Sequence, residues 1–167
     1  ALDTAQTARI FSGETARFRD INGALPNKDI VLLVRDSGAG STELLQEVVM
    51  KDKQLSKRAL QLPSQGALLQ RLQANDSAVA YISSGLVAQP DSGLHGIALD
   101  GVAPSNDNVI NGKYKLARPL YVVVKNEPNK LARAFVNYLL ADGQKIVEAQ
   151  GYVPARAGGG VVAAGSR

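Results

Sequence analysis

Residues 30–42 have the sequence IVLLVRDSGAGST, and this stretch decides the fold class of the chain. Its first five residues are apolar and mostly β-branched, which predicts a strand buried on both faces, as in a parallel sheet. The small residues after Arg35 predict a turn, and the apolar pattern from Glu43 to Met50 predicts an amphipathic helix. A buried strand that leads through a turn into a helix is the repeating unit of an α/β fold.

Short apolar strands and helices alternate along the rest of the chain. We expect further strands at 60–62, 79–82, 97–99 and 120–124, and helices at 4–11, 67–74, 106–113, 129–140 and 143–150. The first helix would begin at Asp3 or Thr4 and end at Ser12-Gly13. Together these segments predict an α/β fold with a central, mostly parallel sheet that is flanked by helices.

The composition is that of a globular protein with a basic surface. Of the 167 residues, 45% are hydrophobic and 20% are charged, so the chain can bury a core. The formal net charge is +4, but Lys and Arg are scattered, with no run longer than Lys57-Arg58. A nucleic-acid binder usually has a clustered basic face, so we do not expect one here. Scattered positive charge suits the attraction of small anions.

The sequence lacks the residues that several kinds of chemistry require. The chain has no Cys, and its single histidine, His95, lies in a Gly-flanked loop, so we expect neither a metal site nor a cofactor. The Walker A pattern is missing, and no pair of carboxylates has a spacing that indicates acid–base catalysis. We therefore expect no catalytic residues and no enzyme activity. No signal peptide opens the sequence, which implies either that it was removed or that the sequence begins inside a longer protein.

The turn from Arg35 to Thr42 is the candidate functional segment. Free backbone N–H groups at the start of a helix favour anions, and a guanidinium at the end of the strand can donate two parallel N–H bonds. Gly38 and Gly40 would let the backbone approach a ligand, and serine or threonine hydroxyls would add donors. An ordinary explanation stays open: Ser41 or Thr42 could simply cap the helix, and Arg35 could belong to a surface ion pair.

Residues 34–41, VRDSGAGS, closely resemble the R-[DE]-x-G-S-G-T segment of the phosphate-binding proteins that serve ABC transporters. Further segments of that family are matched in the same order along the chain. These are 10–14 (IFSGE), 64–67 (SQGA), 78–83 (AVAYIS), 98–102 (ALDGV), 114–121 (YKLARPLY), 142–145 (DGQK) and 151–154 (GYVP). The resemblance therefore covers nearly the whole chain, to about Pro154.

This resemblance implies a set of ligand residues. Phosphate would be held by Arg35, by the N–H groups of Ala39 and Gly40, and by the hydroxyl and N–H of Ser41. Ala39 stands where the family commonly has Ser, which removes one donor, whereas Ser41 replaces Thr and keeps its hydroxyl. Secondary candidates for the site are Ser37, Gly38, Thr42, Ser64 and Gln65.

The resemblance also implies a domain organisation. Residues 1–116 would form the ligand-binding lobe of a periplasmic-binding-protein fold. Residues 117–154 would supply a returning strand and C-terminal helices of a partial other lobe, and residues 155–167 would be a flexible tail. The family's N-terminal first-lobe segment, with its own phosphate loop, has no counterpart in this sequence.

The implied function is non-covalent capture of inorganic phosphate, or a similar oxyanion, for an ABC permease. The protein would then be periplasmic or exported, and its further partner would be the missing first lobe or a second copy. The alternative is an interaction or sensory module of the same fold with a weakened or vestigial oxyanion site. An enzyme that acts on phosphorylated substrates is a more distant alternative, because no nucleophile and base are paired.

Overall fold

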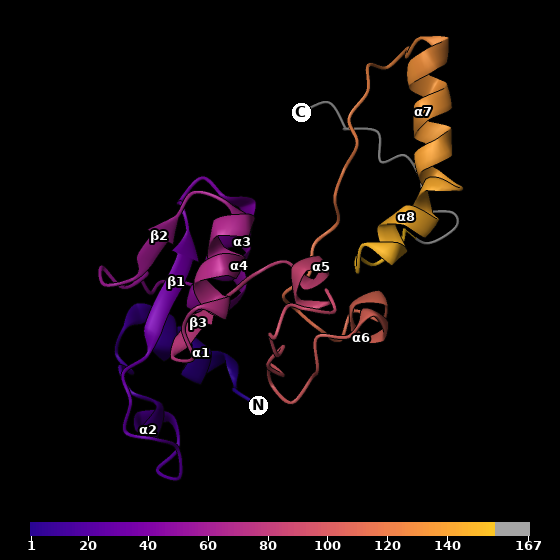
Figure 1. Ribbon diagram of the computed structural model, residues 1–167. Helices are drawn as coiled ribbons and strands as arrows, with labels where there is room; N and C mark the ends of the chain where they lie inside the picture. The colour runs from indigo at the N-terminus through magenta and orange to yellow at the C-terminus, as the bar shows by residue number, and fades with distance from the viewer. Residues whose placement is uncertain (156–167) are drawn as a thin grey trace. The chain divides into compact units, whose positions relative to one another are not determined.

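The strand expected at 30–34 is the central strand of a parallel sheet in the computed structural model, which describes residues 1–155 (Figure 1). It is β1 (Val31–Arg35), and it lies between β2 (Leu60–Leu62) and β3 (Ala78–Ala80) in the order β2-β1-β3. Both pairs are parallel. Leu32, Leu33 and Val34 are buried, which confirms the two-sided burial predicted from the apolar run.

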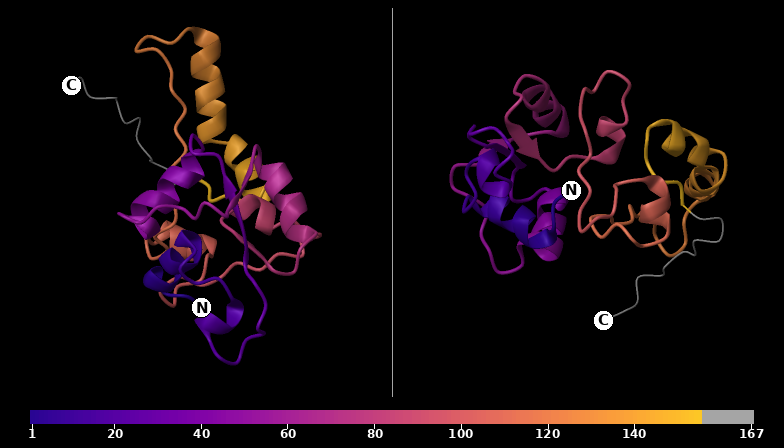
Figure 2. Two further views of the ribbon diagram at one scale, coloured as in Figure 1. Left: turned by 90° about the vertical axis from the view of Figure 1, so that its left-hand side faces the viewer. Right: turned by 90° about the horizontal axis from the view of Figure 1, so that it is seen from below.

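Helices lie beside this sheet (Figure 2). Apolar side chains from three of these helices form the core with β1. The helices up to residue 118 are α1 (Thr4–Ser12), α2 (Phe18–Ile21), α3 (Gly40–Leu45), the π-helix η1 (Gln46–Met50), α4 (Gln65–Gln73), α5 (Ser84–Val87) and α6 (Asn106–Ile110). The core cluster contains Ala8, Ile10, Phe11, Leu32, Val34, Leu45, Val49, Met50 and Leu99. The sheet flanked by helices confirms the predicted α/β class.

The ends of α1 follow from its sequence. Asp3 is the N-cap, and its side chain accepts a hydrogen bond from the N–H of Gln6 at 2.6 Å. Gly13 ends the helix with a left-handed φ of 82°, a conformation that favours glycine. Of the two N-caps that the sequence allows, the structure therefore selects Asp3.

The helix expected at 43–50 begins earlier and changes its winding. α3 begins at Gly40, and at Gln46 the chain continues as η1. The Gln46 side chain donates to the carbonyl oxygens of Lys51 and Lys53 at 2.7 and 2.8 Å, which satisfies carbonyls beyond the last turn. This wider winding still buries Val49 and Met50 in the core.

Two of the expected strands are not assigned as strands. Of residues 97–99, only Leu99 makes bridges, to Leu2 and to Val102. Residues 120–124 have the apolar sequence of a buried strand, yet Leu120 is 83% and Val123 is 89% exposed. Strand hydrogen bonds need a neighbouring strand, and within residues 1–155 none pairs with this segment. The short helices α2 and α5 had not been expected.

The chain divides into two compact units, Ala1–Arg118 and a second unit that begins at Pro119. The second unit contains α7 (Lys130–Leu140) and α8 (Gly143–Ala149), as the sequence predicts, and Asn129 caps α7 by accepting from the N–H of Ala132 at 2.8 Å. Apolar side chains on α7 and α8 are exposed, namely Leu131, Phe135, Tyr138, Leu140 and Ile146. Whether this unit belongs to another lobe stays a prediction, and most of the expected tail, 156–167, lies outside the described residues.

Candidate functional site

The turn after β1 lies where the sequence predicts it, between the carboxyl end of the central strand and the start of a helix. β1 ends at Arg35, and α3 begins at Gly40 with Ala39 as its N-cap. The N–H of Ala39 donates to the carbonyl oxygen of Asp36 at 3.1 Å and closes the turn. The strand–turn–helix geometry on which an anion site depends is therefore confirmed.

Two backbone N–H groups stay available at the start of the helical run that continues to Met50. The N–H groups of Thr42 and Glu43 donate to the carbonyl oxygen of Ala39, at 2.8 and 3.2 Å. Within the described part of the chain, no acceptor pairs with the N–H groups of Gly40 and Ser41. Such free N–H groups, at the positive end of a helix, attract anions.

Ala39 is one of the phosphate donors that the resemblance implies. Its N–H is already used inside the turn, so of the two N–H groups predicted before Ser41 only that of Gly40 is free. Ala39 also provides no side-chain oxygen to cap α3. The missing side-chain oxygen leaves the first N–H groups of the helix open to a ligand.

Arg35 reaches the turn from the end of β1. Its Nε donates to the carbonyl oxygen of Leu62 at 3.2 Å, and its Nη2 donates to Oδ1 of Asp36 at 3.0 Å. These bonds use one N–H on each of two nitrogens, so the remaining guanidinium N–H groups can meet a ligand. The Arg35 side chain is only 16% exposed, which fixes its orientation and strengthens its electrostatic interactions.

Thr42, one of the secondary ligand candidates, makes structural contacts inside the turn. Its buried hydroxyl donates to the carbonyl oxygen of Asp36 at 2.9 Å and lies 2.6 Å from the hydroxyl of Tyr81. A hydroxyl has one proton, so the Tyr81 O–H is the donor to Thr42 Oγ1. Thr42 therefore holds the turn from inside.

Tyr81 links this turn to the core. Its ring packs on Phe11 with a centroid distance of 5.7 Å, and burial raises the pKa of its phenol, although the hydrogen bond with Thr42 opposes that shift. The phenol is therefore neutral at physiological pH and can donate to Thr42. This contact places α1, β3 and the candidate site in one packed unit.

Replacing Tyr81 with Phe is expected to cost about 1 kcal/mol of the free energy of unfolding, because the buried hydrogen bond to Thr42 is lost. Urea unfolding followed by circular dichroism measures this cost. Tyr114→Phe is the matched control, since the Tyr114 side chain has no hydrogen bond within residues 1–155. Equal stability losses for the two variants would contradict the structural role of the Tyr81 hydroxyl.

The other secondary candidates lie in two places. Ser37 and Gly38 are exposed at the tip of the turn. Ser64 is the N-cap of α4, where its Oγ accepts from the N–H of Ala67 at 3.1 Å, and Gln65 Oε1 accepts from the N–H of Ser83 at 3.4 Å. Ser64 therefore acts as an ordinary cap in this structure.

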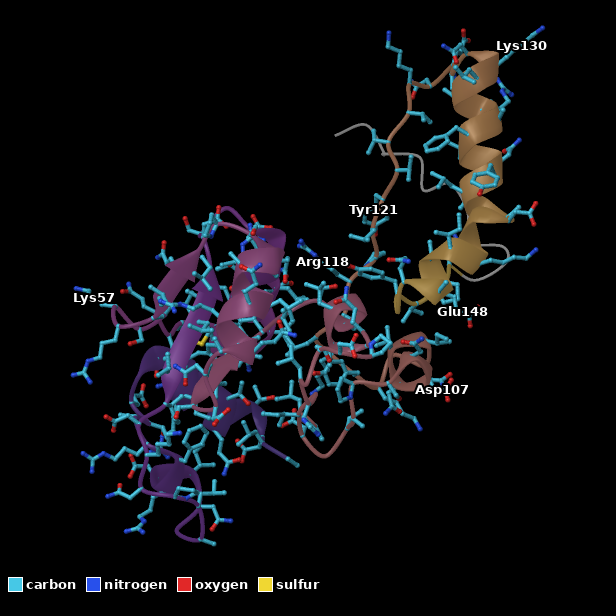
Figure 3. The ribbon with its side chains drawn as sticks, viewed as in Figure 1. Lys57, Asp107, Arg118, Tyr121, Lys130 and Glu148 are labelled. Atoms are coloured by element: carbon cyan, nitrogen blue, oxygen red, sulfur yellow. The ribbon has the colours of Figure 1, made fainter. Side chains whose placement is uncertain are left out.

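One further cation lies at the turn, and the sequence patterns did not indicate it. This cation is Arg118, which is labelled in Figure 3. Its guanidinium lies against Gly40, and its Nη1 is 3.8 Å from Oε2 of Glu43. The resemblance includes Arg118, but only within a segment that was expected to form a strand. No local pattern could place its side chain beside a turn so far away in the sequence.

Within residues 1–155, no group of three or more His, Cys, Asp or Glu residues could hold a metal ion, and no helix is both long and apolar enough to cross a bilayer. One surface hollow is lined by Leu99, Asp100, Val102, Lys113 and Lys115. A second is lined by α1, by the end of η1 and by residues 51–53. Neither hollow includes the turn after β1.

In open parallel α/β sheets, ligands bind beyond the carboxyl ends of the strands, which is where the turn after β1 lies. Residues 1–143 match the family model described as "PBP superfamily domain". The chain belongs to that superfamily.

The curated proteins to which this chain is similar include phosphate-binding proteins. The chain is 25% identical over 160 residues to the phosphate-binding protein PstS of Staphylococcus haemolyticus, covering 91% of this chain and 50% of that protein. It is 28% identical to PstS of Staphylococcus epidermidis (strain ATCC 12228), covering 91% and 49%. The chain thus spans about half the length of these curated relatives.

Solved structures agree with the fold. A putative phosphate ABC transporter substrate-binding protein from Clostridium perfringens, solved with bound phosphate, superposes with a TM-score of 0.81 at 25% identity. That match covers 92% of this chain and 63% of the other. PstS from Borrelia burgdorferi superposes with a TM-score of 0.69 at 21% identity, covering 94% and 65%. The fold is therefore that of the substrate-binding proteins of ABC transporters.

Proposed function

We propose that this chain binds inorganic phosphate, or a similar oxyanion, without covalent chemistry, as part of the substrate-binding component of a phosphate ABC transporter. The named relatives support this proposal, and so does the phosphate in the Clostridium perfringens structure. These names favour a transport role over the alternative of an interaction or sensory module with a vestigial site.

One observation carries the proposal: the free N–H groups of Gly40 and Ser41 lie at the start of a helix that follows the Arg35 strand. N–H groups at a helix start and a guanidinium fork are the donors that a tetrahedral oxyanion requires. Arg35, Gly40 and Ser41 would hold the anion, while Ser37 and Gly38 would border it. Ala39 would contribute only after giving up its bond to Asp36.

The second unit supports a role within a two-lobed protein. Residues 120–124 and the apolar side chains of α7 and α8 are exposed, which is unfavourable for a complete domain. The chain also spans about half the length of its relatives. Residues 117–154 would therefore join a polypeptide segment that this sequence does not contain and complete the other lobe with it.

The remaining assignments follow from this role. The relatives are named as binding proteins, so the chain would act without catalysis and would deliver its ligand to an ABC permease. It would therefore act outside the cytoplasmic membrane, in the periplasm or as an exported protein. It would need neither a metal nor a cofactor to hold the anion.

Titration of the ¹⁵N-labelled chain with sodium phosphate, followed by NMR, tests the proposal. The amide signals of Gly40 and Ser41 should shift most and should saturate together. Titration with sodium chloride at equal ionic strength is the control for screening. Shifts that are absent from this turn, or that chloride reproduces, would overturn the proposed function.

A further inference from the structure

Arg118 is the last residue of the first unit, and its guanidinium occupies the space that a side chain at residue 40 would fill. A Cβ built on Gly40 would lie 1.6 Å from Nη2 and 2.7 Å from Cζ of Arg118. Gly40 does not have the positive φ that favours glycine, so its backbone conformation would accept another residue. What the missing side chain provides is room for the guanidinium beside the first turn of α3.

This placement puts two positive groups together. The start of a helix carries partial positive charge, so a cation there is unfavourable unless a negative group lies close by. Glu43, in the first turn of α3, provides such a charge, with its Oε2 3.8 Å from Nη1 of Arg118. The Glu43 carboxylate thus offsets the repulsion between the Arg118 guanidinium and the positive end of the helix.

The pair of Arg118 and Glu43 is also easily separated. The two side chains are 43% and 69% exposed, and ion pairs this open to water contribute little to folding stability. A phosphate at the N–H groups of Gly40 and Ser41 would carry more negative charge than one carboxylate. It would therefore compete well for the guanidinium.

Building on the function proposed above, we propose that Arg118 is a second phosphate-binding guanidinium, which Glu43 holds beside the site and which exchanges that carboxylate for the bound anion. Arg35 reaches the anion from the end of β1, and Arg118 reaches it from the last residue of the first unit. Glu43 thus has two opposing effects. It keeps Arg118 in place, and it lowers phosphate affinity by repulsion and by competition.

Phosphate titrations of four variants, monitored at the Gly40 and Ser41 amides, test this role. Arg118→Ala should weaken binding about tenfold, and Arg118→Lys should recover part of the loss, because a lysine keeps the charge but lacks the fork. Glu43→Gln should tighten binding about twofold to threefold, as expected when an exposed competing charge is removed. Arg71→Ala, on the exposed side of α4, removes the same charge elsewhere and should change the affinity by less than about twofold.

The possible results separate this inference from the function on which it rests. If Arg35→Ala weakens binding but Arg118→Ala and Arg71→Ala match the parent, the Arg118 proposal is wrong and the proposed function stands. If phosphate moves neither amide in the parent chain, the proposed function fails, and this inference fails with it. Should Arg118→Ala not fold, Arg118→Lys and Glu43→Gln decide the matter, and the proposal is overturned if both bind like the parent.

Discussion

Phosphate binding is expected to tighten by at least about a hundredfold when the chain is joined to the half of a relative that it does not match. Two additional charge-assisted hydrogen bonds, at about 1.5 kcal/mol or more each, are sufficient for this gain. Closure of a second lobe would also remove water from the anion and strengthen the bonds to Arg35. Calorimetric titration of the chain, and of its fusion to the unmatched part of Staphylococcus epidermidis PstS, measures the difference.

The unmatched part of the relative alone is the control, because it measures any phosphate binding that does not involve this chain. The fusion should bind far more tightly than either part. Sub-micromolar affinity in the monomeric 167-residue chain would contradict this prediction, since the turn after β1 would then suffice alone. Sub-micromolar affinity only in a dimeric sample would show that a second copy takes the place of the missing lobe.

Arg35→Ala is expected to reduce phosphate affinity by about one to two decades. A charge-assisted hydrogen bond contributes roughly 1.5–3 kcal/mol, and the low exposure of Arg35 places the guanidinium in the stronger part of that range. Arg35→Lys should restore only a fraction, because an ammonium cannot give two parallel N–H bonds. Phosphate titration of both variants beside Arg71→Ala, at one salt concentration, makes the comparison.

Arg35 also donates to the carbonyl oxygen of Leu62, so the stability of each variant has to be measured beside its affinity. Urea unfolding separates a loss of ligand contact from a loss of folded protein. If Arg35→Ala binds as well as the parent while it stays folded, Arg35 has a structural role, and the interaction-module alternative becomes the better explanation.

The sequence was most informative where a structure depends on neighbouring residues. The apolar run before Arg35 and the small residues after it predict the strand, the turn and the helix start, because local backbone preferences and burial on both faces act there together. The N-cap at Asn129 and the glycine that ends α1 are equally local. Resemblance to a family added the prediction that the turn after β1 faces a ligand.

The rest depends on contacts that no local pattern encodes. The N–H of Ala39 is used within the turn, and Thr42 turns inward to Tyr81, which lies 39 residues further along the chain. Arg118 approaches Gly40 only in the folded unit. The apolar residues 120–124 were expected to form a strand from composition, but pairing requires a second strand, and none pairs with them within the described residues.

Because β1 is the middle strand of the sheet, its two neighbours must reach it from later parts of the chain. β1 pairs with both β2 and β3, so Leu33 becomes a partner of Leu60 on one side and of Ala80 on the other. Parallel pairs of this kind must close long loops first, which makes them slow to form. The bond that orients Arg35 spans 27 residues and exists only after β2 has joined β1. We therefore expect the proposed phosphate site to form late in folding, so that phosphate would slow unfolding more than it would speed folding.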